Sequence, residues 1–120
     1  MITGVHALIY TPQAEAVRTF LRDTLGWHSV DGGGGWPIFA MPPAEVGVHP
    51  HEDASFHELY LMCDDIEATR AELTAKGVEF DGPVRDEGWG LVSTMKIADG
   101  ETMMVYQPRH PTAISGTAPA

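Results

Sequence analysis

The same order of predicted elements occurs twice in this chain of 120 residues. Each copy has a strand, an amphipathic helix and three short strands, and the second copy begins about 52 residues after the first. At this offset His6 aligns with Glu58 and Leu21 with Leu73. One coincidence of this kind arises easily by chance, but the repeated order of all the elements does not. The repeat therefore predicts two modules that fold together as one α+β domain over residues 1–110.

The first module is expected over about residues 1–50. An alternating strand pattern covers residues 4–10, and Thr11 followed by Pro12 predicts the start of a helix. Gly26 is placed to end that helix at its C-terminus. Three strands are expected to complete the module, at residues 27–30, 36–41 and 45–49.

The second module is expected over about residues 56–108 and repeats this order. A strand over 56–63 leads into a helix that we expect Asp64 to cap and Gly77 to end. Asp99-Gly100 predicts a tight hairpin turn. The module's remaining strands are predicted at residues 78–80, 91–98 and 102–107. Residues 111–120 are rich in Pro, Ala, Ser and Thr and are expected to form a flexible tail.

Charge and cysteine content narrow the expected partners and location. The formal net charge is -10, and the seven Lys and Arg residues are scattered, so neither nucleic acid nor a membrane surface is an expected partner. There is no apolar run of the length that a membrane span requires. Cys63 is the one cysteine, and the first residues lack the pattern of a secretory signal. We therefore expect a cytoplasmic protein.

Several local motifs, in this order and spacing, resemble the glyoxalase/bleomycin-resistance/dioxygenase superfamily, also called the vicinal oxygen chelate superfamily. The segment 6–10 resembles the family's opening strand with its metal-binding histidine. The segment 61–67 resembles the corner between strand and helix in the second module, and 75–80 the helix exit. Asp99-Gly100, a strand and then Gln107-Pro108 resemble the closing hairpin. The resemblance implies two tandem βαβββ modules whose mixed sheet curves into a cup, and it implies a homodimer.

The resemblance also implies four metal-ligand positions, on the first and last strands of each module. They fall here on His6, Glu58, Val46 and Met104. Valine cannot bind a metal, and a methionine thioether suits soft ions. A bulge or a shifted register would turn His49 inward and give a set of His6, His49 and Glu58. The cofactor is therefore either one divalent ion (Fe, Mn, Ni or Zn) or none, and His6 with Glu58 is equally explained as a hydrogen-bonded structural pair.

The cup would bind a small organic molecule among aromatic and sulfur-containing side chains. The face that carries His6 and Glu58 is expected to present Tyr10, Tyr60, Met104 and Tyr106, while Trp36, Phe39 and Trp89 wall or cover the opening. Two functions stay open. One is metal-assisted lyase, isomerase or dioxygenase chemistry with Glu58 as ligand or proton shuttle, and the other is a metal-free protein of bleomycin-resistance type that sequesters a drug.

Overall fold

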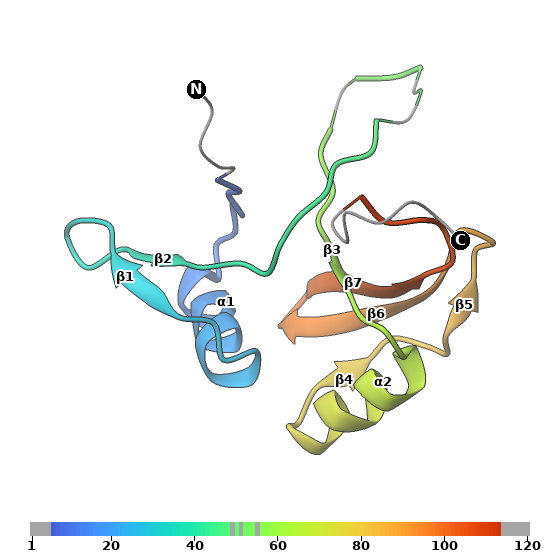
Figure 1. Ribbon diagram of the computed structural model, residues 1–120. Helices are drawn as coiled ribbons and strands as arrows, with labels where there is room; N and C mark the ends of the chain where they lie inside the picture. The colour runs from blue at the N-terminus through green and yellow to red at the C-terminus, as the bar shows by residue number, and fades with distance from the viewer. Residues whose placement is uncertain (1–5, 49, 51, 55, 114–120) are drawn as a thin grey trace.

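The computed structural model describes residues 6–48, 50, 52–54 and 56–113. It is an α+β fold with two sheets, as the sequence predicted (Figure 1). The first half contains helix α1 (Ala14–Thr19), the π-helical turn η1 (Phe20–Thr24) and strands β1 (Ser29–Asp31) and β2 (Pro37–Phe39). The second half contains β3 (Tyr60–Met62), α2 (Ile66–Ala75), β4 (Glu79–Phe80), β5 (Arg85–Asp86), β6 (Gly90–Ala98) and β7 (Glu101–Pro108). None of the helices in these described residues is long and apolar enough to cross a membrane.

Among the described residues, the larger sheet is built from strands of the second module. Its strands lie in the order β3-β7-β6-β4, and β5 also pairs with β6. β3 runs parallel to β7, whereas β6 and β7 form the hairpin that turns at Gly100. The βα connection through α2 lets β3 and β7 lie parallel, because parallel strands need a crossover between them.

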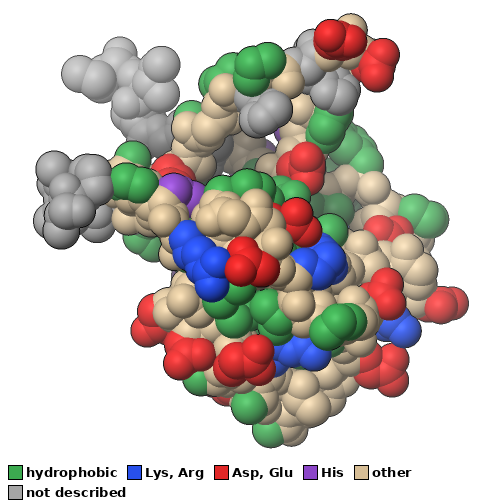
Figure 2. All heavy atoms as spheres, turned by 90° about the vertical axis from the view of Figure 1, so that its right-hand side faces the viewer, with side chains coloured by type: hydrophobic (Ala, Val, Ile, Leu, Met, Phe, Trp, Pro, Cys, Tyr) green, Lys and Arg blue, Asp and Glu red, His purple; other side chains and the backbone are tan. Residues whose placement is uncertain are grey.

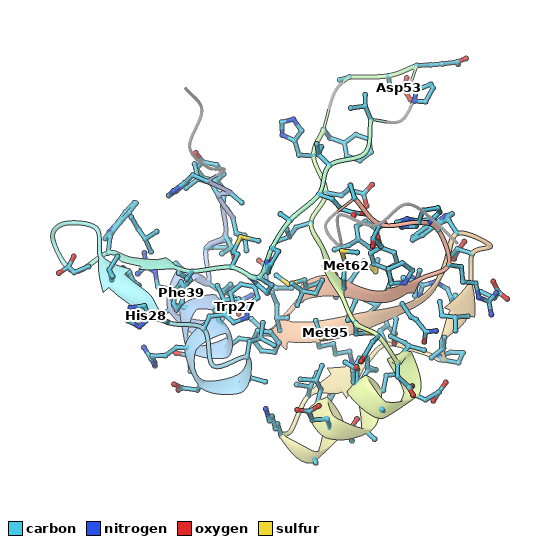
Figure 3. All side chains as sticks on the ribbon, in the orientation of Figure 1. Trp27, His28, Phe39, Asp53, Met62 and Met95 are labelled. Carbon is cyan, nitrogen blue, oxygen red and sulfur yellow. The ribbon has the colours of Figure 1, made fainter. Side chains whose placement is uncertain are left out.

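One face of this sheet is covered by α2 and forms the core. Ile66 and Leu73 of the helix belong to the same buried cluster as Met95 and Val105 of the sheet. Figure 3 shows Met95 on β6 near α2, and its side chain is fully buried. Burial on this side and partial cover on the other explain why β6 is apolar along most of its length rather than strictly alternating.

The helix of the first module packs onto the same core. Val17, Phe20 and Leu21 join the buried cluster, so α1 and η1 extend the core beyond the end of the β6–β7 hairpin. The Thr11 hydroxyl donates to the Glu101 carboxylate at 2.6 Å, and the Gln13 amide donates to the Asp99 carbonyl. These contacts tie the first helix to the hairpin turn of the second module.

The strands predicted at the two ends of the first module are wrong for the described residues. Residues 6–10 and 45–48 belong to no strand, and β1 and β2 form an isolated hairpin. A strand is stable only when a neighbour pairs with its backbone, and the alternating pattern of these segments cannot supply that neighbour. Conversely, β5 was not predicted, since a pair of residues is too short to show a period.

The second helix begins one residue later than predicted. Asp65, rather than Asp64, occupies the cap position, and its carboxylate accepts a hydrogen bond from the Ala68 amide at 3.1 Å. Asp65 has the extended backbone of a cap residue (φ -145°, ψ 105°), and its carboxylate reaches the N3 amide of the first turn. Gly77 has the left-handed backbone (φ 93°) expected just after the helix.

Candidate ligand-binding site

The sheet face opposite α2 carries two rows of side chains. Tyr60, Met104 and Thr94 are neighbours across β3, β7 and β6 and make the first row. Met62, Tyr106, Val92 and Arg85 make the second row. Residues paired side by side in a sheet project to the same face, so both rows face away from α2. We call this surface the cup face, and it contains the predicted residues Tyr60, Met104 and Tyr106.

Three aromatic rings gather at one end of the cup face. The ring centroids of Tyr60 and Trp89 are 5.9 Å apart, those of Tyr60 and Tyr106 5.7 Å, and those of Trp89 and Tyr106 5.3 Å. All three pairs meet edge to face, which is the favourable arrangement for aromatic quadrupoles. Tyr106 is buried, whereas Trp89 is 45% exposed and offers ring surface to a ligand.

The turn that carries Trp89 is closed by hydrogen bonds on several sides. The Glu87 amide donates to the Gly90 carbonyl at 3.0 Å, and the Trp89 carbonyl accepts from the Arg109 amide at 2.9 Å. After β7, the His110 ring stacks on Tyr106 with its Nε2 3.0 Å from the phenol oxygen. The aromatic cluster is thus held by β3, the β5–β6 turn and the segment after β7.

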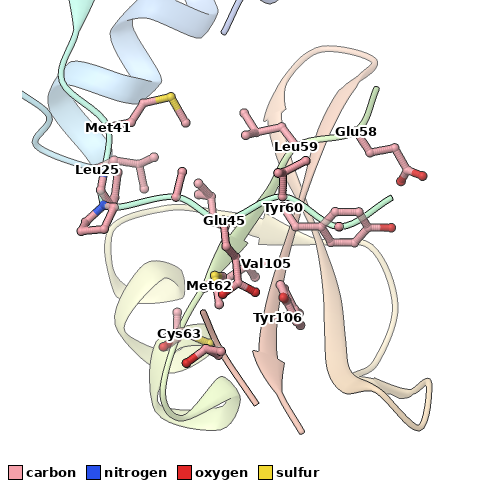
Figure 4. A pocket seen from close by; sticks show the side chains of 18 of the residues that line it. Leu25, Met41, Glu45, Glu58, Leu59, Tyr60, Met62, Cys63, Val105 and Tyr106 are labelled. Atoms are coloured by element: carbon pink, nitrogen blue, oxygen red, sulfur yellow. The ribbon is translucent and has the colours of Figure 1, made fainter. Parts of the chain in front are cut away.

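A long groove of about 1490 Å³ passes beside this cluster. It follows β3 and is lined by the segment 41–48, the end of η1 and α2 (Figure 4). Its lining is mainly apolar and includes Tyr60, Trp89 and Tyr106. The charged side chains that line it are mostly acidic: Glu45, Asp53, Glu58 and Glu72, with Lys76 as the basic one. A groove of this composition suits an organic molecule larger than a metal ion or a small anion.

Carboxylates act on both tyrosines of the cluster. Burial raises the pKa of the Tyr60 phenol, and a hydrogen bond to Glu58 raises it further because the carboxylate stabilises the protonated phenol. Burial likewise raises the pKa of Tyr106, with a smaller effect from Glu45. Glu45 extends from the segment 41–48 toward Met62 and Tyr106 in Figure 4, and it accepts a hydrogen bond from the Ala113 amide at 2.8 Å. Both phenols therefore stay neutral donors at physiological pH.

Three predicted ligand-binding residues lie away from this cluster. Tyr10 is 89% exposed. The Arg18 guanidinium lies over the Trp36 ring, with its central carbon 5.6 Å from the ring centroid. Phe39 is partly buried against the core cluster and lies beside α1 with Trp27 in Figure 3. All three belong to the first module, whose strands in the described residues are limited to the β1–β2 hairpin.

The predicted metal ligands are not brought together in the described part of the chain. His6 and Glu58 are both exposed, and His49 lies outside the described residues. No three His, Cys, Asp or Glu side chains gather as a metal site among the described residues. At Met104 the sulfur accepts from the Thr94 hydroxyl at 3.1 Å and lies 3.7 Å from an Arg85 nitrogen. A thioether beside a guanidinium does not fit a hard divalent cation, so the described residues do not suit that cofactor.

Two residues near the cup were missed by sequence reasoning. Glu45 was expected in a strand that the structure lacks, so its approach to Tyr106 could not be foreseen. Arg85 lies in a strand of two residues and carries no periodic signal. Its place on the cup face follows only from the pairing of β5 with β6.

Comparison with known families decides the assignment. A profile of the Glyoxalase/Bleomycin resistance protein/Dioxygenase superfamily matches residues 4–105. The chain belongs to this superfamily. No curated protein matches the chain.

Solved structures of the superfamily fold are similar over nearly the whole chain. TnmS3, an antibiotic binding protein from Streptomyces sp. CB03234, matches with a TM-score of 0.62 and 27% identity, covering 89% of this chain and 97% of its own. A lactoylglutathione lyase from Agrobacterium tumefaciens matches with a TM-score of 0.61 and 14% identity, covering 88% and 92%. A superfamily member from Sphaerobacter thermophilus matches with a TM-score of 0.57 and 24% identity, covering 88% and 98%. The last two likenesses show the fold alone.

Proposed function

We propose that this superfamily member binds a small aromatic molecule and holds it without chemical change, as an antibiotic-binding protein does. The observation that carries the proposal is the cluster of Tyr60, Trp89 and Tyr106 beside an apolar groove. Flat rings supply large contact areas at little cost in side-chain entropy, and exposed Trp89 is the ring best placed to meet a ligand. The likeness to TnmS3, which is described as an antibiotic binding protein, supports this class of ligand.

The test is a titration of the purified protein with a panel of planar aromatic antibiotics and simple naphthalenes by isothermal calorimetry. We expect at least one antibiotic to bind and to be recovered unchanged. A Trp89→Ala variant should bind it about tenfold more weakly, because one aromatic contact is lost, and Trp89→Phe should retain most of the affinity. Binding of no compound in the panel, or equal affinity in Trp89→Ala, would contradict the proposal.

The metal-assisted alternative predicts a different result in the same preparation. It requires a divalent ion on His6, Glu58 and His49 and Glu58 as a proton shuttle. Stoichiometric metal by elemental analysis that is lost in His6→Ala, together with conversion of the bound compound, would favour that chemistry over sequestration.

We further propose that two copies associate in the cytoplasm. Apolar side chains stand exposed on described segments that have no strand partner: Leu8 is 63% exposed, Val46 89% and Val48 95%. The single cysteine, Cys63, suits a reducing compartment. Exposed apolar segments of this kind are typical of surfaces that a second copy covers. Light scattering after gel filtration should give twice the mass of the 13.0 kDa chain, and a monomer at micromolar concentration would refute the association.

A further inference from the structure

Arg85 extends a guanidinium across the cup face. Its backbone pairs with Val92, which places Arg85 in the same row as Tyr106. The side chain then reaches the neighbouring row, where one nitrogen lies 3.3 Å from the Thr94 hydroxyl and another 3.7 Å from the Met104 sulfur. Arg85 also acts electrostatically on the Tyr60 phenol. A cation, a hydroxyl and a phenol therefore lie close together on the cup face, beside the groove that Tyr60 also lines.

The hydrogen bonds that the Arg85 guanidinium makes within the protein are long or go to uncharged acceptors. Its ion pair among the described residues, with Glu87, is 3.4 Å long. Its other two contacts are to a neutral hydroxyl and to a thioether, and the thioether is a weak acceptor. The side chain is 41% exposed. By contrast, Arg22 and Arg109 hold carboxylates at 2.8 and 2.7 Å. In Figure 2, which faces the β5 side of the molecule, the basic side chains lie interspersed among acidic ones.

The guanidinium lies beside Met104, which falls where the resemblance expected a metal ligand. A guanidinium 3.7 Å from this sulfur repels any divalent ion that approaches. The same guanidinium can nevertheless do what a cation does for a ligand, which is to attract oxygen atoms. Its planar fork offers two parallel N–H groups, a geometry that a pair of oxygen acceptors satisfies together.

We propose that Arg85 is the specificity-determining residue of the cup face. Its guanidinium would bind oxygen atoms on one edge of a flat, uncharged aromatic ligand. The ligand would carry a carbonyl and a hydroxyl side by side, with its rings against Trp89 and Tyr60. A fully anionic ligand is disfavoured because Glu58 and Glu87 lie nearby and the chain has a net charge of -10. This inference rests on the proposed function, since it names the chemistry of the molecule that the same site holds.

The experiment compares two probes by isothermal calorimetry: 1-hydroxy-2-acetonaphthone, which carries the oxygen pair, and 2-methylnaphthalene, which carries none. We expect the wild-type protein to bind the oxygenated probe more tightly. Arg85→Met should lower the affinity for the oxygenated probe by about tenfold or more, since the charge-assisted hydrogen bonds are lost. Arg85→Lys should weaken it similarly, because an ammonium lacks the fork. Neither change should alter the affinity for 2-methylnaphthalene.

Lys96→Met is the matched control, since it removes one positive charge from the same sheet, at an exposed position paired with Glu79. It should leave both affinities unchanged. Equal weakening of both probes in Arg85→Met would mean that Arg85 only supports the fold, and unchanged binding of the oxygenated probe would also overturn the inference. If the wild-type protein binds both probes with equal affinity, the role proposed for Arg85 is refuted and the proposed function stands. If it binds neither probe nor any antibiotic of the panel, the proposed function fails as well.

Discussion

Gly90 provides the sharpest test of how the aromatic cluster is packed. A Cβ built at this position would lie 2.8 Å from Cδ2 of Tyr106 and 2.9 Å from the carbonyl oxygen of Gln107. Both distances are under 3.0 Å, a separation that real Cβ atoms essentially never show. The Tyr106 ring is buried in the cluster, and the Gln107 carbonyl belongs to the β7 backbone, so neither can move away freely.

The expected cost of Gly90→Ala follows from two opposing effects. Overpacking of a well-packed site costs about 1–3 kcal/mol. Gly90 does not have a left-handed backbone, so alanine gains about 0.4–1 kcal/mol through the lower entropy of the unfolded chain. The overpacking is larger, and we expect the free energy of unfolding to fall by about 1–2 kcal/mol.

Equilibrium unfolding in urea, followed by circular dichroism, measures this change. Gly47→Ala is the matched control, because nothing lies within 4 Å of a Cβ there and its backbone is not left-handed. That variant should be as stable as the wild type or slightly more so. The near-ultraviolet spectrum of Gly90→Ala should also change as Tyr106 is displaced. A Gly90→Ala protein at least as stable as Gly47→Ala would refute the packing described for β6 and β7.

Two further predictions concern ionisation and helix capping. The pKa of the Tyr60 phenol is raised above its ordinary value of 10.0, so its contribution to stability is fully present below pH 10 and is lost as the pH rises through the folded-state pKa. In Glu58→Gln the phenol should ionise at a lower pH than in the wild type, which ultraviolet titration would detect, and an unchanged titration curve would show that the two groups do not interact. Asp65→Ala should lower the free energy of unfolding by about 1 kcal/mol in urea, because the Ala68 amide loses its acceptor. Asp64→Ala should lower the free energy of unfolding much less. A larger loss in Asp64→Ala than in Asp65→Ala would mean that Asp64 is the cap.

The repeat in the sequence predicted the α+β class, and the repeat together with the local motifs predicted the superfamily. Tyr60, Met104 and Tyr106 were assigned to one face from the alternation of side chains, and pairing of β3 with β7 confirms that they share it. Alternation along a strand is a local property of the extended backbone, so the sequence determines it once the strand exists.

The tertiary structure alone decided which predicted strands exist and which distant groups meet. Residues 6–10 and 45–48 alternate as strands do, but pairing depends on a neighbour that no local pattern specifies. Arg85 reaches Thr94 and Met104 because β5 pairs with β6 in a particular register, across a turn that brings Trp89 against Tyr106. Contacts of this kind depend on how elements pack, and a single sequence does not encode them in any spacing along the chain.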